Sequence, residues 1–117
     1  MYMANTATIP TSTASTQTLF DSAARQFAIA SDHRKQARLL SFDGDLDSTR
    51  AAKVRLLQAG QASGFADTCI TALVDGFDPV DRLHHARMHA LARSLVQNGI
   101  GFDQFTAIMQ TARVFSA

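Results

Sequence analysis

The stretch of sequence that decides the fold is residues 77–99, which read FDPVDRLHHARMHALARSLVQNG. It predicts a helix of nearly 20 residues, because Asp78 can cap the first turn and Pro79 suits a first helical position that needs no N–H. Apolar side chains recur at the helical spacing of three or four residues, and Asn98-Gly99 ends the pattern. This stripe comprises Val80, Leu83, His84, Met88, Leu91 and Leu95. We expect this helix to be the central element.

The flanking sequence predicts further helices on both sides. After residue 99, Asp103 is expected to cap a last helix whose inward face holds Phe105, Ile108, Met109, Ala112 and Phe115. Before residue 77, residues 64–75 predict a short helix with a wide apolar face. A longer helix is expected to start at Asp47 or Ser48 and to stop at Gly60, with Ala51, Val54 and Leu57 buried.

The N-terminal part predicts a tail followed by a helix. Residues 4–18 hold eight Ser or Thr and little that is large and apolar, so residues 1–17 are predicted to be a flexible tail. Thr18 and Asp21 form a capping box that begins the first helix. The pattern weakens after Ile29, so the helix either continues to Ser41 or gives way to a second one capped by Asp32. The prediction is an all-α, compact bundle of five or six helices that forms a single domain over residues 18–117.

Composition narrows the function class. A chain of 117 residues with 46% apolar content fits one domain, and its formal net charge of +1 gives no overall attraction to nucleic acid or anionic membrane. Cys69 is the only cysteine, which excludes an intrachain disulfide and favours a reducing compartment. There is no secretory signal pattern and no apolar run of the roughly 20 residues that a membrane span needs. A cytoplasmic protein without a membrane partner is therefore predicted.

Catalytic and calcium-binding patterns are incomplete. Cys69 lies in an apolar segment without a basic neighbour in sequence, and the chain has no nucleophile elbow, phosphate loop or dinucleotide fingerprint. Residues 42–47 place three carboxylates at alternate positions, as calcium loops do. A calcium loop starting at Asp43 would need Gly and Glu where the chain has Ser48 and Val54. We therefore predict neither an enzyme nor a cofactor, and we interpret the acidic cluster as a helix start.

The histidine-rich segment is the best metal candidate. His85 and His89 lie four residues apart on the predicted helix, with Asp81 one turn earlier, so the three could converge on a cation. However, no Glu completes an H-E-x-x-H pattern, and neighbouring arginines would repel a cation. His84 is interpreted as a packed, hydrogen-bonded core residue. A metal protein or enzyme is kept as a third hypothesis, while Arg82, His85, His89 and Arg93 are predicted to form a polar flank for a partner.

Residues 64–73, which read GFADTCITAL, resemble the turn and second helix of a helix-turn-helix. Gly64 would occupy the turn, and Ile70 and Leu73 would pack inward. The resemblance implies a DNA-binding transcriptional regulator that acts as a dimer, which is the second hypothesis. The segment departs from this pattern where DNA would be read, because it exposes Asp67 and contains neither Arg nor Lys.

The remaining signal is the basic segment 33–38, in which Arg34, Lys35 and Arg38 should form a solvated positive edge. The leading hypothesis is a small non-enzymatic interaction protein that docks through this edge on a larger protein or nucleoprotein complex, as an adaptor or inhibitor. Small phage- and plasmid-encoded inhibitors of bacterial defence complexes share this general character, a comparison of class alone. Direct nucleic-acid binding is the less favoured partner interaction, and a homodimer remains open.

Overall fold

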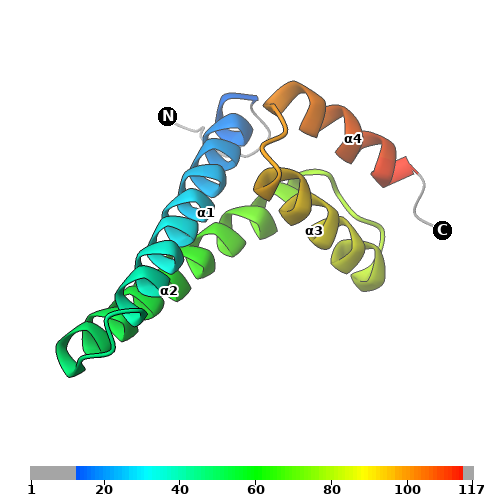
Figure 1. Cartoon of the computed structure of the whole chain (residues 1–117). Helices are drawn as coiled ribbons and strands as arrows, with labels where there is room; N and C mark the ends of the chain where they lie inside the picture. The colour runs from blue at the N-terminus through cyan, green and yellow to red at the C-terminus, as the bar shows by residue number, and fades with distance from the viewer. Residues whose placement is uncertain (1–12, 115–117) are drawn as a thin grey trace, which may run out of the picture.

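The computed structural model describes residues 13–114, which form four α-helices (Figure 1). They are α1 (Thr13–Ser41), α2 (Leu46–Gly76), α3 (Arg82–Gln97) and α4 (Phe102–Val114). The prediction of an all-α fold is confirmed. The prediction of five or six helices is wrong, because α2 joins two segments that were expected to be separate helices.

Helix α1 begins earlier than the sequence pattern indicated. It is already helical at Thr13, so Thr18 and Asp21 lie inside the helix and do not start it. Residues 13–17 of the predicted tail are therefore helical, while the rest of that tail and Phe115 lie outside the described residues. No second helix begins at Asp32, since α1 runs on without a break to Ser41.

Helix α2 passes straight through both glycines that were expected to interrupt it. A glycine in a helix interior costs about 1 kcal/mol relative to alanine. Packing overrides this local cost, because Ala59, Ala62 and Ala66 of the same stretch are buried. The Thr68 hydroxyl donates to the Gly64 carbonyl at 3.1 Å, one helical turn back. The turn of the predicted helix-turn-helix at Gly64 is therefore not formed.

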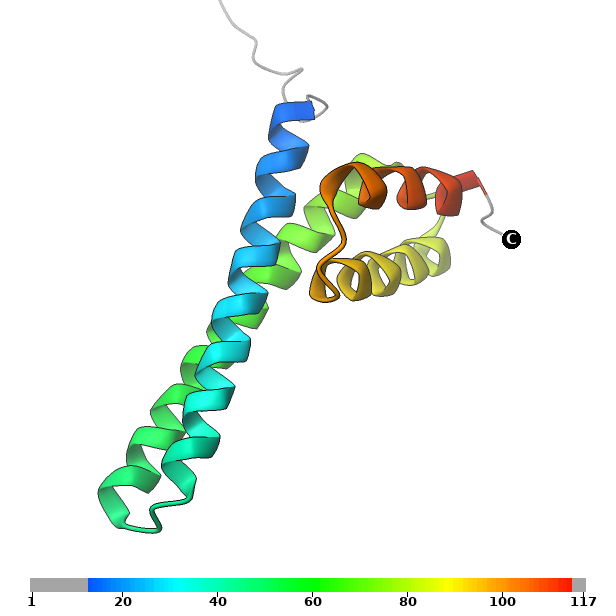
Figure 2. The same cartoon turned by 45° about the horizontal axis from the view of Figure 1, so that its top comes forward.

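Helices α1 and α2 form a long antiparallel hairpin, and α3 and α4 lie against one end of it (Figures 1 and 2). The buried positions of α1 at 20, 23, 27, 30 and 37 follow the three-and-four spacing of a heptad seam, as do positions 52, 59, 62, 66, 69 and 73 of α2. We call residues 28–65, which hold the loop end of the hairpin, the arm. The other described residues, 13–27 and 66–114, are the head.

The head contains the large side chains of the core. The Phe105 ring lies 5.0 Å from the Phe20 ring and 6.3 Å from the Phe77 ring, centroid to centroid. Other members of this cluster come from all four helices, namely Ala23, Phe27, Ala66, Cys69, Ile70, Leu73, Val74, Met88, Ala92, Val96 and Met109. The hairpin therefore provides the framework of the fold, and α3, which was expected to be central, covers one end of it.

The arm is packed differently. Its buried side chains are all alanines, Ala30, Ala37, Ala52, Ala59 and Ala62. The predicted burial of Val54 and Leu57 is wrong, because these side chains are 53% and 64% exposed. Alanine on both helices allows a close approach of the two backbones, so the seam forms along the alanines and the larger side chains lie outside it.

The starts of α3 and α4 also differ from the predictions. Asp81, not Asp78, caps α3, since its carboxylate accepts the His84 N–H at 2.8 Å. Asp78 has a positive φ of 56° and precedes Pro79 in the connecting loop. In α4 the first helical hydrogen bond runs from the Phe105 N–H to the Gly101 carbonyl at 2.9 Å. Asp103 thus lies within the first turn of α4 and is not its N-cap.

Candidate functional site

His84 lies in the core of the head, where it is 3% exposed. Its Nδ1 is 3.1 Å from the Val80 backbone N–H, and its Nε2 is 3.2 Å from the Ala112 carbonyl oxygen. Because a backbone N–H can only donate, Nδ1 is the acceptor, and the ring proton lies on Nε2 and is donated to Ala112. The prediction of a packed, hydrogen-bonded histidine is confirmed. Both ring nitrogens are occupied within the fold.

The other members of the proposed metal cluster do not converge on one point. His85 Nε2 lies 3.0 Å from the Asp75 carboxylate, and its ring is stacked 6.4 Å from that of His89. Asp81 serves as the cap of α3. Among residues 13–114, no group of three or more His, Cys, Asp or Glu side chains is arranged to hold a metal ion.

The acidic residues before α2 are engaged in starting that helix. The Asp45 carboxylate accepts the Ser48 N–H at 2.7 Å, and the Ser48 hydroxyl lies 3.2 Å from carboxylate oxygens of both Asp43 and Asp45. The backbone bond from Ser48, followed by its hydroxyl, lowers the pKa of Asp45. The interpretation of this cluster as a helix start is confirmed, although the helix begins at Leu46.

Cys69 is buried in the head core, as the apolar surroundings in the sequence indicated. Burial raises the pKa of its thiol, which disfavours the thiolate that a nucleophile requires. The side chain packs as a small apolar residue of the cluster.

Three of the seven predicted partner-binding residues lie on the arm, and all three are exposed: Arg34, Lys35 and Arg38. Arg34 Nη2 donates to the Ser63 hydroxyl at 2.8 Å, which places its guanidinium over one face of the hairpin. Arg38 follows one turn later and Leu56 lies two turns before Ser63, so both share that face. Of the three ion pairs found among the described residues, none involves these three cations.

The remaining four predicted residues lie on α3. Arg93 Nε is 3.5 Å from a carboxylate oxygen of Asp67, and its guanidinium carbon is 5.7 Å from the Phe27 ring centroid. Arg82 is exposed at the start of the helix, and His85 and His89 lie between it and Arg93. Because Ser63 and Asp67 are one turn apart on α2, Arg34 and Arg93 occupy the same face of the hairpin. We call Arg34, Arg38, Leu56 and Arg93 the basic face.

A groove of about 490 Å³ lies on the same side, where the C-terminal end of α3 meets α1. Phe27, Ser31 and Arg34 line it from α1, and Val96 and Gln97 line it from α3. The basic face is therefore hollowed next to Arg34. The sequence did not predict this groove, because its walls come from helices more than 60 residues apart in the chain.

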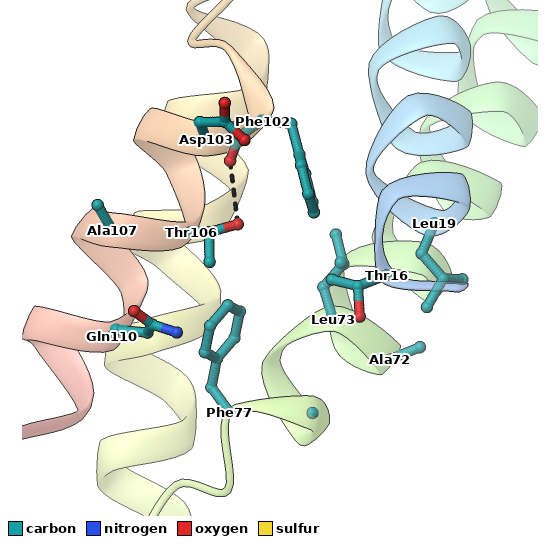
Figure 3. Close-up of a pocket in the computed structure, with 11 residues that line it drawn as sticks. Thr16, Leu19, Ala72, Leu73, Phe77, Phe102, Asp103, Thr106, Ala107 and Gln110 are labelled. Carbon is teal, nitrogen blue, oxygen red and sulfur yellow. Dashed lines mark hydrogen bonds between the residues drawn. The ribbon is translucent and has the colours of Figure 1, made fainter. Parts of the chain in front are cut away.

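A second groove, of about 430 Å³, lies between the start of α1, the end of α2 and α4 (Figure 3). Leu19, Leu73, Phe77 and Phe102 make much of its wall. The Thr106 hydroxyl donates to the Phe102 carbonyl at 3.0 Å, so it is engaged within its own helix. Among the described residues that line this groove, Asp103 is the only ionisable one. The lining suits an apolar side chain.

The arm also exposes large apolar side chains, among them Val54 and Leu57, which the sequence pattern had placed in the core. Seven of them are each at least half exposed: Leu39, Phe42, Leu46, Val54, Leu56, Leu57 and Phe65. The signal that could have revealed them is the run of alanines at heptad spacing, which competes with the larger residues for the seam. The exposed apolar groups make the arm unlike an ordinary solvated surface.

Comparison with known proteins adds no relative: no family model, no curated protein and no solved structure matches the chain. Within residues 13–114, none of the helices combines the length and the apolar character needed to cross a lipid bilayer.

Proposed function

We propose that this chain is a small non-enzymatic interaction protein whose arm docks on a larger protein or nucleoprotein complex, as an adaptor or inhibitor. The observation that carries the proposal is the composition of the arm. Its seam buries alanines alone, while Leu56 is exposed on the same face as the exposed Arg34 and Arg38. Exposed apolar groups accompanied by arginine are typical of binding surfaces.

The arginines of the basic face suit an acidic partner surface. Arg34 and Arg38 are exposed and lie outside the ion pairs found among the described residues. A guanidinium presents several N–H donors in a planar arrangement that matches carboxylate and phosphate groups. Arg93 is closer to Asp67 and Phe27, so we expect it to hold α3 on the hairpin more than to contact a partner.

The test is affinity capture from the native host with paired charge reversals. The variant Arg34→Glu with Arg38→Glu should capture at least tenfold less partner, because two attractive contacts become repulsive. The matched control is Arg87→Glu with Arg113→Glu, which makes the same charge change at exposed positions of the head. Nuclease treatment of the lysate separates a protein partner from a nucleic-acid one.

Binding should also weaken with salt in the wild type and lose most of that dependence in the Arg34/Arg38 variant. Equal capture by both double variants would remove the basic face from the proposal. Capture that disappears after nuclease treatment would assign nucleic acid as the direct partner.

A further inference from the structure

The groove beside Arg34 combines apolar walls with a polar rim. Phe27 and Val96, which are 7% and 5% exposed, line it as apolar groups, while Ser31 and Gln97 add a hydroxyl and an amide at exposed positions. Its volume of about 490 Å³ falls within the range of roughly 300–1,000 Å³ that is typical of ligand pockets. The groove therefore suits a large apolar side chain of a binding partner.

Arg34 is the only charged residue among the described residues that line this groove. Its Nη2 donates to the Ser63 hydroxyl at 2.8 Å, which fixes one side of the guanidinium. No other hydrogen bond or ion pair of this side chain is found within residues 13–114. A guanidinium has five N–H donors, so most of those of Arg34 remain for a ligand. A carboxylate at the mouth of the groove would be a suitable acceptor.

Further cations follow the groove along α1. Lys35 is one turn after Ser31 and Arg38 is one turn after Arg34, so both lie on the stripe of α1 that lines the groove, and both are exposed. At 1.5 Å per residue, Arg38 lies about 10 Å beyond Ser31 along the helix axis. No residue at this spacing is acidic, since the stripe comprises Ala24, Phe27, Ala28, Ser31, Arg34, Lys35 and Arg38. An apolar recess is thus followed by cations within the reach of a short peptide.

The negative groups near the other wall of the groove are already engaged. The carbonyl groups at the C-terminal end of a helix carry partial negative charge, but those of residues 94–96 accept hydrogen bonds from backbone N–H groups of residues 98–100. Asp67 lies one turn after the Arg34 contact on α2, and it is paired with Arg93 at 3.5 Å. The electrostatic character of the groove is therefore set by Arg34 and by the cations that follow it.

The same groove is a poor site for a nucleic acid. Proteins bind single-stranded nucleic acid largely by stacking its bases on exposed aromatic rings, and the Phe27 ring is buried. Arg93 already lies over that ring, with its guanidinium carbon 5.7 Å from the ring centroid. A phosphate backbone would contact the cations and leave the apolar walls of the groove without a partner. An acidic protein segment that also carries a large apolar side chain would use both.

We propose that the groove receives a large apolar side chain from an acidic segment of the partner protein, while carboxylates of the same segment pair with Arg34 and Arg38. In an extended segment, which advances about 3.3 Å per residue, these carboxylates lie within about four residues of the apolar side chain. This inference rests on the proposed function and names the chemistry of its partner. It assigns the direct contact to protein and not to nucleic acid.

The first test titrates the full chain with synthetic peptides and follows its ¹H–¹⁵N NMR signals. The probe is Gly-Ser-Phe-Gly-Glu-Glu-Asp-Gly-Ser with blocked ends. One comparison peptide replaces Phe by Gly, and the other replaces the three acidic residues by their amides. The probe should shift the signals of Ser31, Arg34 and Gln97. Both comparison peptides should bind at least fivefold more weakly, because each lacks one part of the interaction.

Three results of this titration would overturn the proposal. The first is no shift of the groove signals at millimolar probe. The second is equal affinity for the peptide without Phe, because the groove would then contribute nothing. The third is tighter binding of an oligouridylate of nine nucleotides to the same residues at the same salt concentration, because nucleic acid would then be the better ligand.

The second test fills the groove in the protein itself. Ser31→Trp places a large side chain at an exposed lining position, so it should lower both the affinity for the probe and the capture of the native partner at least tenfold. The matched control is Gln104→Trp, which is exposed on α4 and outside the groove lining. Circular dichroism confirms that both variants remain helical.

The two proposals fail in different ways. Capture that survives Ser31→Trp but is lost in the Arg34/Arg38 variant would overturn the groove as the docking site and leave the proposed function intact. Binding of the probe without any capture from the host would support the groove and count against the proposed function alone.

Discussion

The head and the arm are built from the same two long helices, yet they are held together by different means. In the head, α1 and α2 separate large side chains from water with the help of α3 and α4, and Phe105, Ile70 and Met109 are fully buried. In the arm no third layer covers the hairpin among the described residues, and the two helices bury only alanines between them. Two helices alone exclude water only from the narrow seam between them. Large apolar side chains therefore need additional helices to cover them.

This difference indicates where the stability of the protein lies. Burial of a Phe, Leu or Met side chain contributes about 1.5–3 kcal/mol, whereas an alanine methyl contributes roughly 0.8 kcal/mol. The head therefore supplies most of the free energy of folding, and the arm extends from it as a helical continuation. The large apolar groups outside the alanine seam of the arm remain available for association.

The largest effect is expected from truncating the head core. Phe105→Ala should lower the free energy of unfolding by about 3–5 kcal/mol, because Phe105 is fully buried against two other rings. Leu57→Ala in the arm should change it by less than about 0.5 kcal/mol, because Leu57 is mostly exposed. Denaturant unfolding followed by circular dichroism measures both. Similar losses for the two variants would contradict the division into head and arm.

The next effect tests the alanine seam. Ala59→Leu should destabilise the arm by about 1–3 kcal/mol, because Ala59 is buried between two closely packed helices. Ala28→Leu, at an exposed position of the same hairpin, is the control and should be nearly neutral. Amide hydrogen exchange should become faster in residues 28–65 and stay unchanged in the head. Protection that stays the same in the arm would show that the seam has room for leucine.

A smaller effect on stability is expected at the entry to α3, where it distinguishes the capping aspartate from the other one. Asp81→Ala should cost about 1 kcal/mol, because it removes the acceptor of the His84 N–H. Asp78→Gly should change stability by less than about 0.5 kcal/mol, since relief of the positive φ offsets the greater freedom of glycine in the unfolded chain. The Asp78 ion pair with Arg113, at 3.6 Å, is mostly exposed and adds little. Thermal unfolding compares the two, and a larger loss for Asp78→Gly would contradict the assignment of the cap.

The smallest effect concerns the start of α2 in the arm. The hydrogen bonds from Ser48 lower the pKa of Asp45 from its ordinary 3.8. The ionised cap therefore stabilises the folded state fully above pH 3.8, and this stabilisation is lost as the pH falls through the pKa of the folded state. The stability difference between wild type and Asp45→Ala should thus be full at neutral pH and shrink below about pH 3.8. Hydrogen exchange of the backbone N–H groups in the first turn of α2 measures this stability difference. Asp45→Asn keeps an acceptor at every pH and should not show this dependence.

Local chemistry predicted much of the fold. The helical class, the connection near residues 42–45 and the burial of His84 and Cys69 were readable from spacing and from turn residues. The helix boundaries around Thr18 and Gly60 were not, because a local stop signal of about 1 kcal/mol is outweighed by packing that involves residues far apart in sequence. Asp78 and Asp81 are equivalent as isolated cap candidates, and only the path of the loop into α3 decides between them.

The candidate site was predictable only as separate pieces. Arg34, Arg38 and Arg93 stood out as basic residues, but their place on one face depends on how α3 crosses the hairpin. The exposure of Val54 was missed for a related reason. Periodicity ranks residues by apolar character and placed Val54 in the core, whereas the pairing of alanines on two helices turned it outward.

The hydrogen bonds of His84 have a practical consequence for studies in solution. Its ring accepts a hydrogen bond from Val80 in the loop before α3 and donates one to Ala112 at the end of α4, which lies 28 residues further along the chain. The ring proton is therefore fixed on Nε2. A shielded ring proton in a hydrogen bond exchanges slowly with solvent and gives its own resonance in a proton spectrum. That single signal would report whether α3 and α4 are joined, while every change described above in the arm should leave it in place.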